Sequence, residues 1–142
     1  MDLSGKVCVI TGASSGIGKS LSLKFASRGA SVALAARRNS KLTSITDEIK
    51  QSGGNAIGIK TDITKSIECK NLIDETLDQY GRIDLLLLVA GVSMWTPFEK
   101  ISDISLVPNI SPQIFELITN DDISIILYFW IPRRMSFFRK TI

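Results

Sequence analysis

The chain has 142 residues, of which 44% are hydrophobic and 22% charged, a composition typical of one globular domain and not of a disordered, collagen-like or disulfide-rich chain. Its formal charge of +3 comes without a dense basic run, so we expect a small anionic ligand and no nucleic-acid partner. The chain contains no histidine, which excludes Ser-His-Asp and Cys-His nucleophilic sites and His-ligated zinc or haem.

The first predicted unit is a strand followed by a helix. Residues 7–10 form an almost unbroken apolar run, as expected of a strand that helices bury on both faces. Within residues 16–28, Ile17, Leu21 and Phe25 recur every four residues. This spacing predicts an amphipathic helix that packs on the sheet and ends before a glycine.

The same alternation continues along the chain. Strands are predicted at residues 31–36, 55–59 and 83–89, the last of which is the most apolar. A helix is predicted in each of the two intervals between them, the second over residues 65–80. The residues expected on the buried faces of these helices are Leu42, Ile45 and Ile49 in the first, and Cys69, Ile73, Leu77 and Tyr80 in the second.

Alternating strands and helices predict a three-layer α/β fold, namely a Rossmann-like, doubly wound parallel sheet. Sequential right-handed crossovers give the spatial strand order 3-2-1-4, in which strands one and four are central in a complete sheet. We expect residues 1–100 to form this region and the sheet to be incomplete after its fourth strand.

The pattern changes after about residue 100. All four prolines fall in the last third of the chain, so residues 101–142 are expected to form a divergent tail. Residues 123–131 are interpreted as a buried strand, a membrane-surface contact or an aggregation-prone segment. Residues 133–140 mix cations and aromatics, and a poorly ordered terminus is favoured there over a membrane or nucleic-acid contact.

Cysteine usage and the N-terminal sequence indicate the compartment. Cys8 and Cys69 lie in apolar stretches without CxxC spacing, which indicates core packing and not a disulfide, metal or redox role. The N-terminus has no basic-then-apolar signal region, and no apolar run reaches the ~20 residues that span a bilayer. We expect a cytoplasmic protein without a metal site, with a peripheral membrane contact by the tail as the alternative.

The residues with the clearest chemical role follow the first strand. The segment Thr11-Gly12-Ala13-Ser14-Ser15-Gly16-Ile17-Gly18 lies where a doubly wound fold binds dinucleotides at a helix N-terminus. Gly12 permits a tight turn, Gly16 lets the backbone approach a pyrophosphate, and Gly18 removes a side chain where helix meets strand. A P-loop nucleotide hydrolase is excluded, because the Gly-Lys-Ser tripeptide at 18–20 lacks the four-residue spacing from Gly12.

This spacing resembles the Thr-Gly-x-x-x-Gly-Ile-Gly signature of the short-chain dehydrogenase/reductase family, and the resemblance covers roughly residues 3–100. Other matching pieces are Lys60-Thr61-Asp62-Ile63-Thr64, Ile83-Asp84-Leu85-Leu86 and Ala90-Gly91-Val92. The resemblance implies hydride transfer between a nicotinamide cofactor and an alcohol or carbonyl carbon. It also implies these positions: Ser14 and Ser15 at the phosphate loop, Asp62 and Ile63 at the adenine, Ala90 and Gly91 beside the ribose. Asp62 has an alternative role as a cap of the next helix or turn.

The end of the second strand indicates which cofactor is bound. A carboxylate there would bind the ribose 2′-hydroxyl of NAD(H), whereas a basic side chain would accept the 2′-phosphate of NADP(H). The chain has Arg37 and Arg38 at this point, and two guanidiniums can hold a phosphate through charge-assisted hydrogen bonds. NADP(H) is therefore expected over NAD(H), with a solvated pair of charges at the helix start as the alternative.

The chain departs from the family pattern in two places. Leu88 and Val89 stand where the family usually has two asparagines that brace the sheet and cofactor loop. The family's catalytic Tyr-x-x-x-Lys pair is missing, since neither Tyr80 nor Tyr128 has a lysine four residues on. Asn109, which lies between two prolines, is a poor match for the catalytic asparagine. We therefore assign no catalytic residue.

These observations predict an NADP(H)-dependent oxidoreductase of the short-chain type in a chain that lacks the catalytic half. A small alcohol or carbonyl substrate is expected only in a complete homologue. Truncation, alternative splicing and an incorrect gene model each explain this pattern. The alternative is a non-catalytic NADP(H)-binding or interaction module with the apolar tail as a partner surface. Self-association is expected if the apolar edge of residues 83–89 is left open and not covered by residues 123–131.

Overall fold

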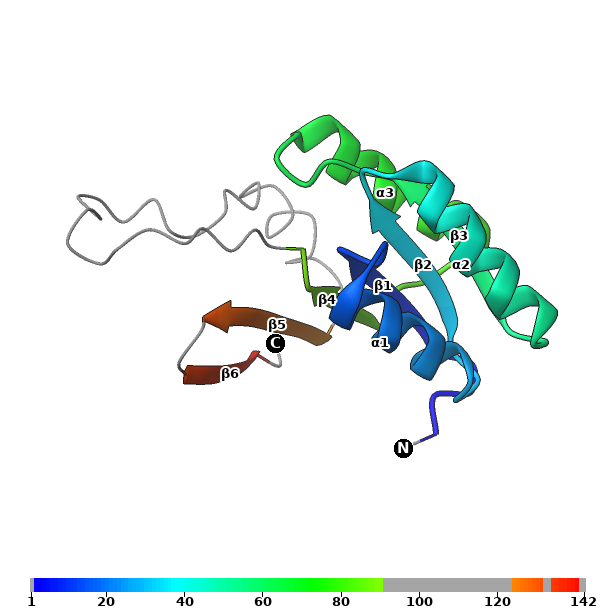
Figure 1. Ribbon diagram of the computed structural model, residues 1–142, viewed down its shortest axis with the longest axis horizontal. Coiled ribbons are helices and arrows are strands. Elements are labelled where there is room, and N and C mark those ends of the chain that lie inside the picture. Colours follow the sequence, from blue (N-terminus) through cyan, green and yellow to red (C-terminus); the bar gives the residue numbers. More distant parts are fainter. Residues whose placement is uncertain (1, 91–123, 132–133, 141–142) are drawn as a thin grey trace.

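The structure is a computed structural model in which residues 2–90, 124–131 and 134–140 are described. Strands and helices alternate in its N-terminal part, as predicted, and two further strands follow (Figure 1). The elements are β1 (Val7–Thr11), α1 (Gly16–Ala26), β2 (Ser31–Ala36), α2 (Asn39–Gln51), β3 (Asn55–Lys60), α3 (Ser66–Tyr80), β4 (Leu85–Leu88), β5 (Ser124–Ile131) and β6 (Arg134–Lys140). Most bounds agree with the predicted ones within two residues.

The sheet has the order β3-β2-β1-β4-β5-β6. The first five strands run parallel, and β6 is antiparallel to β5. The predicted doubly wound arrangement and its 3-2-1-4 order are therefore confirmed. With β1 between β2 and β4, the carboxyl ends of these three strands meet at one edge of the sheet, where such folds bind ligands.

The sheet continues beyond the fourth strand, contrary to the expectation that it is incomplete there. In the register, Leu85 lies opposite Ser124 and Leu88 lies opposite Leu127, so β4 is an interior strand. This confirms the strand interpretation of residues 123–131. The physical reason is that an apolar run of β-branched and aromatic residues pairs readily with the edge that β4 would otherwise expose.

The C-terminal basic and aromatic segment forms β6, whereas we expected a poorly ordered terminus. Its residues pair antiparallel with β5, from Ile131 opposite Arg134 to Ile125 opposite Lys140. The cations suggested a solvated end, but Met and Phe at alternate positions favour a strand once a partner strand is present.

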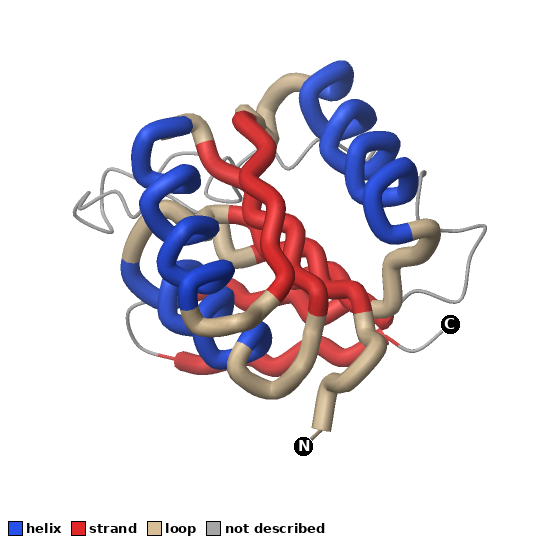
Figure 2. The backbone as a smooth tube through the Cα atoms, turned by 90° about the vertical axis from the view of Figure 1, so that its right-hand side faces the viewer, coloured by secondary structure: helices blue, strands red, loops and turns tan. Residues whose placement is uncertain are grey.

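Side chains from alternate positions of β1 to β4 fill two separate core layers, one on each face of this part of the sheet. Figure 2 shows helices on both sides of the strands. Helices α1 and α2 cover one face, where Ile10, Leu34 and Leu42 are fully buried. Helix α3 covers the other face, where Cys69 and Leu72 pack against neighbouring strand residues. Both faces are therefore dry, which explains the apolar runs of the central strands.

The buried stripe of α1 lies one position along from the predicted one. Gly18, Ser22 and Ala26 are its buried residues, whereas Ile17 is 44% exposed and Leu21 is only partly buried. Small residues on this stripe let the helix backbone approach the sheet closely, so the larger side chains lie at its margins. Similarly, Leu72 and Thr76 are buried in α3 while the predicted Leu77 is 38% exposed.

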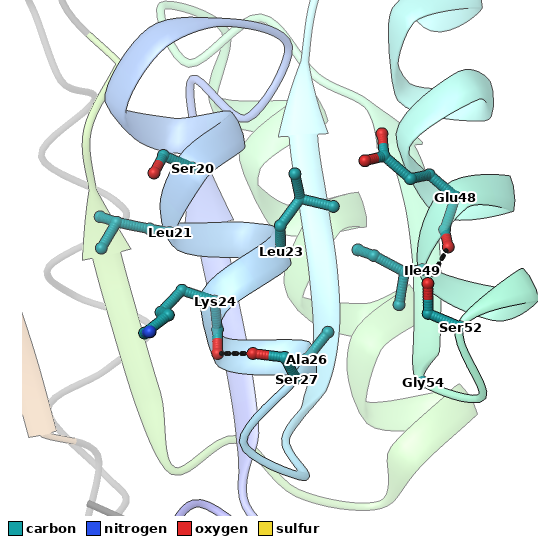
Figure 3. Close-up of a pocket in the computed structure, with 10 residues that line it drawn as sticks. All are labelled: Ser20, Leu21, Leu23, Lys24, Ala26, Ser27, Glu48, Ile49, Ser52 and Gly54. Carbon is teal, nitrogen blue, oxygen red and sulfur yellow. Dashed lines mark hydrogen bonds between the residues drawn. The ribbon is translucent and has the colours of Figure 1, made fainter.

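A groove of about 860 Å³ lies between the C-terminal halves of α1 and α2 (Figure 3). Two serine hydroxyls at its lower rim donate hydrogen bonds to main-chain carbonyls, Ser27 to Lys24 at 2.9 Å and Ser52 to Glu48 at 3.0 Å. The groove is at the opposite end of α1 from the glycine segment and is therefore separate from the site below. No helix in the described ranges is long and apolar enough to cross a membrane.

Candidate functional site

The glycine segment forms a tight loop between β1 and the N-terminus of α1. Gly12 and Gly16 have φ values of 68° and 55°, in the left-handed region that glycine adopts without steric cost. A Cβ on Gly12 would lie 2.8 Å from the Ala90 main chain, so the loop and the chain after β4 touch directly. A Cβ on Gly16 would meet nothing within 4 Å. The loop surface at Gly16 is therefore open to a ligand.

Gly18 packs tightly against the loop that precedes α1. A Cβ there would lie 2.3 Å from the carbonyl oxygen of Gly12 and 3.0 Å from the Cα of Ala13. These are main-chain atoms, which cannot move aside without rebuilding the loop. Ala13 is itself fully buried and its N–H donates to the carbonyl of Ala35 at 3.2 Å. The first turn of α1 is thus held against the ends of β1 and β2.

Thr11 connects the loop to the end of β4. Its side chain is fully buried, and Oγ1 accepts hydrogen bonds from the main-chain N–H groups of Val89 at 3.1 Å and Ala90 at 3.2 Å. The same hydroxyl donates to the carbonyl of Leu87 at 3.4 Å. Sequence reasoning placed Thr11 in the loop but missed this bracing role. A hydroxyl at the end of a strand buried on both faces was the available signal, because buried polar groups need partners.

The N-terminus of α1 carries no group that would compete with an anion. The N-cap residue Ser15 makes no side-chain hydrogen bond to the helix, and the first turn contains no acidic residue. The unpaired N–H groups and the positive end of the helix dipole therefore remain available. Such an end is a suitable binding site for a phosphate.

Arg38 lies against the glycine loop. Its Nη2 donates to the hydroxyls of Ser14 at 3.2 Å and Ser15 at 3.3 Å. Arg37 and Arg38 are both exposed, and Arg38 is the N-cap of α2 with an extended backbone. The structure thus brings Arg38 together with both predicted serines, and Arg37 precedes it in the chain. The link from Arg38 to both serines was not predicted.

Asp62 has the capping geometry that was given as its alternative role. Oδ1 accepts from both the N–H and the hydroxyl of Thr64, at 3.1 and 2.8 Å. These two hydrogen bonds, with smaller contributions from the charges of Lys65 and Arg37, hold the pKa of Asp62 below its usual range. The Asp62 N–H in turn donates to Glu68 at 2.7 Å. The assigned contact of Asp62 with adenine stays a prediction.

The remaining predicted residues divide by location. Ile63 is partly buried against the core layer under α3. Ala90 lies beside Gly12, as described above, whereas Gly91 and Asn109 lie outside the described residues. Both cysteines are buried and free, and burial raises the pKa of the Cys8 thiol to about 12. An unreactive core thiol is consistent with the packing role predicted for it.

Tyr80 lies away from the glycine loop. Its hydroxyl is 3.4 Å from Oδ1 of Asn55, the first residue of β3, at the amino ends of the parallel strands. Burial raises the pKa of Tyr80 to about 12. The glycine loop follows the carboxyl end of β1, so Tyr80 is at the wrong edge of the sheet to act there. Tyr128 is within β5.

Comparison with known proteins identifies relatives of the first 109 residues. A family model described as short chain dehydrogenase matches residues 6–109. The chain is 44% identical over 105 residues to an 11-beta-hydroxysteroid dehydrogenase of Pinus massoniana, covering 73% of this chain and 30% of that protein. An uncharacterised oxidoreductase of Listeria monocytogenes is 43% identical over 103 residues, covering 72% of this chain and 42% of the relative.

Solved structures show the same similarity. One is a 7α-hydroxysteroid dehydrogenase complexed with NADH and 7-oxo glycochenodeoxycholic acid, with a TM-score of 0.66 and 38% sequence identity. The match covers 69% of this chain and 38% of the length of that protein. The chain therefore spans less than half the length of these relatives. Because the match includes the glycine loop, the ends of β2 and β3, and β4, the chain belongs to the short-chain dehydrogenase family.

Proposed function

We propose that this chain is an NADP(H)-binding part of a short-chain oxidoreductase, and that it binds the cofactor without catalysing turnover. The observation that carries the cofactor assignment is the placement of Arg38 against Ser14 and Ser15, next to Arg37. No carboxylate stands in the segment from Ala36 to Ser40. A basic pair without an acid at this point favours a 2′-phosphate over a 2′-hydroxyl.

The residues present fit a dinucleotide. Gly16 leaves open space where a side chain would otherwise stand, and the N-terminus of α1 offers uncapped N–H groups to a pyrophosphate. Ser14 and Ser15 add two hydroxyls on the same loop. When bound, the cofactor supplies the hydride donor or acceptor for alcohol and carbonyl chemistry. The contribution of this chain is to bind and orient the cofactor.

Related structures support a nicotinamide dinucleotide but not one particular form of it. A metagenomic short-chain oxidoreductase in complex with NADP has a TM-score of 0.63 and 39% identity over 68% of this chain and 44% of its own. The NADH complex described above is equally similar. The preference must therefore come from the residues of this chain, and the arginine pair is the reason we choose NADP(H).

The assignment is tested by titrating the chain with NADPH and with NADH in a calorimeter. We expect NADPH to bind about tenfold more tightly, or ~1.4 kcal/mol. Arg37→Asp should reduce or reverse this preference. Lys24→Asp, which makes the same charge change in the last turn of α1, should leave the preference unchanged. Equal affinity of the unmodified chain for both cofactors would exclude the 2′-phosphate role.

The absence of turnover follows from the residues that move a proton in this family. The 142 residues contain no Tyr-x-x-x-Lys pair, and Tyr80 lies at the opposite edge of the sheet from the glycine loop. A tyrosine with a pKa of about 12 is protonated at neutral pH and has no lysine to assist it. We therefore expect a loss of several orders of magnitude relative to a complete enzyme.

The experiment follows NADPH absorbance with a panel of aldehydes, ketones, steroids and secondary alcohols. We expect no rate above buffer, although the titration shows binding. A rate abolished by Tyr128→Phe would refute the non-catalytic assignment and would mean that β5 supplies a catalytic group. A rate unaffected by Tyr128→Phe and by Arg37→Asp would indicate a contaminating enzyme, so the Arg37→Asp preparation serves as the control.

A further inference from the structure

The edge strands of the sheet are β3 and β6. Neither has a further partner strand among the described residues. In β3, every second residue turns its main-chain groups away from β2. The N–H of Thr61, directly after the strand, bonds the carbonyl of Ala36 in β2. By alternation, the outward-facing N–H and C=O groups are those of Ala56, Gly58 and Lys60.

A groove of about 590 Å³ follows this edge, with α2 on one side and α3 on the other. Ile57, Gly58 and Ile59 of β3 line it, and Gly58 is exposed. A Cβ on Gly58 would lie 3.1 Å from the Cβ of Leu42, so the glycine lets α2 pack close to β3. The groove follows an exposed strand edge, where an extended segment can add as a further strand.

The groove beside β3 is acidic. Its charged lining residues are Asp47 and Lys50 of α2 with Glu75 and Asp78 of α3. The three carboxylates form no ion pair with any described residue, whereas other acids on the same helices do, such as Asp74 with Lys70. An extended segment that carried positive charge would therefore find unpaired partners along this edge.

The opposite edge strand has the complementary charge. The sequence of β6 contains Arg134, Arg139 and Lys140 and no acidic residue. Figure 1 shows β6 and β3 at opposite sides of the molecule. Because the two edges lie on opposite sides, β6 of one copy can approach β3 of a second copy.

Charge decides among the three ways in which two copies could join edges. Pairing β3 with β3 would bring two acidic grooves together, and pairing β6 with β6 would bring two basic strands together. Like charges at close approach oppose both arrangements. Only β3 against β6 joins the acidic groove to a strand with a basic sequence.

We propose that the edge of β3 in one copy pairs with β6 of a second copy, so that the sheet continues from molecule to molecule. The contact joins two different surfaces, so every complex still has one free β3 edge and one free β6 edge. Such head-to-tail contacts build chains or closed rings larger than a dimer. This proposal does not depend on the cofactor assignment, because neither surface includes the glycine loop.

The test is sedimentation velocity on the full chain over a range of concentration and salt. We expect species larger than a dimer that grow with concentration. Their association should weaken about tenfold or more between roughly 0.05 M and roughly 0.5 M NaCl, because salt screens exposed charges. A chain that remains monomeric at all concentrations, or stops at a dimer, overturns the proposal.

Charge-reversed variants identify the surfaces. One variant carries Asp47→Lys, Glu75→Lys and Asp78→Lys, and a second carries Arg134→Glu, Arg139→Glu and Lys140→Glu. Each variant alone should lose association, since its two edges then have the same sign. An equimolar mixture should regain it, because each groove then meets a strand of opposite charge. Failure of the mixture to associate, with both variants folded by circular dichroism, overturns the proposal.

A separate pair of variants tests strand pairing without changing either the acidic groove or β6. Lys60→Pro removes an outward-facing N–H while the hydrogen bonds from β3 to β2 are kept. Lys60→Ala makes the same charge change and keeps the N–H. We expect Lys60→Pro to associate at least several-fold more weakly than Lys60→Ala. Equal association of these two variants would show that the β3 edge is not paired.

Discussion

Replacing Thr11 with valine tests whether one hydroxyl holds the glycine loop to the end of β4. Valine has nearly the same shape as threonine but no hydroxyl, so the substitution leaves the fully buried site filled. It removes the acceptor of the Val89 and Ala90 N–H groups, which lie at 3.1 and 3.2 Å. The change therefore isolates hydrogen bonding from packing.

The expected cost follows from these two donors. An N–H group that is buried without a partner costs about 1–3 kcal/mol, and both donors here are partly buried, so each should be near the lower end. We expect Thr11→Val to reduce the free energy of unfolding by about 2 kcal/mol. For a chain of this size that lowers the Tm by roughly 6 °C.

The assay is urea unfolding followed by circular dichroism, with Thr11→Ser as the matched control. Serine keeps the hydroxyl and loses one buried methyl group, which costs about 1 kcal/mol. Thr11→Val should therefore be the less stable of the two, although it is closer in shape to the natural residue. It should also bind NADPH more weakly, because the loop loses its support. Equal or greater stability of Thr11→Val would refute the bracing role.

Three further outcomes follow from the loop and from one carboxylate. Gly18→Ala should destabilise the fold by about 1–3 kcal/mol in thermal unfolding, because its Cβ would lie 2.3 Å from the Gly12 carbonyl oxygen. Gly16→Ala should cost only the backbone strain of about 1–2 kcal/mol and yet abolish NADPH binding in calorimetry, since its Cβ enters the open ligand side. Burial raises the pKa of Asp84, but hydrogen bonds, chiefly from the Val7 N–H, outweigh it and hold that pKa below 3.8. Asp84 therefore contributes stability that is present above about pH 4 and lost as pH falls, and Asp84→Asn should flatten this part of the acid unfolding curve.

Sequence reasoning predicted the sheet because its signals are local and strong. The apolar run of β1 follows from burial on both faces, and the pattern of Leu42, Ile45 and Ile49 follows from burial on one face. The same reasoning placed the buried stripe of α1 one residue away, on Ile17 rather than Gly18. Hydrophobic periodicity finds large side chains, whereas close helix–sheet contact here uses small ones, and small residues carry little periodic signal.

Sequence reasoning predicted which residues form the candidate site but not the contacts among them. The spacing of the glycines predicted where the loop is, because each glycine is needed for the backbone conformation or close packing at a fixed position. The hydrogen bonds from Arg38 to Ser14 and Ser15 depend on how the ends of β1 and β2 lie side by side, which no single stretch of sequence shows. The strand β6 was missed for the same reason, since its stability depends on pairing with β5.

The two departures from the family pattern have different consequences. Leu88 and Val89 replace two polar side chains, yet the end of β4 is still tied to the loop, because the donors to Thr11 are main-chain N–H groups that any residue except proline provides. That support therefore survives the change of side chains. Proton transfer has no such substitute, since a main-chain amide cannot replace a tyrosine assisted by a lysine. A chain of this sequence can thus keep a well-formed glycine loop whether or not it catalyses a reaction, and the titration and the rate measurement test cofactor binding and turnover separately.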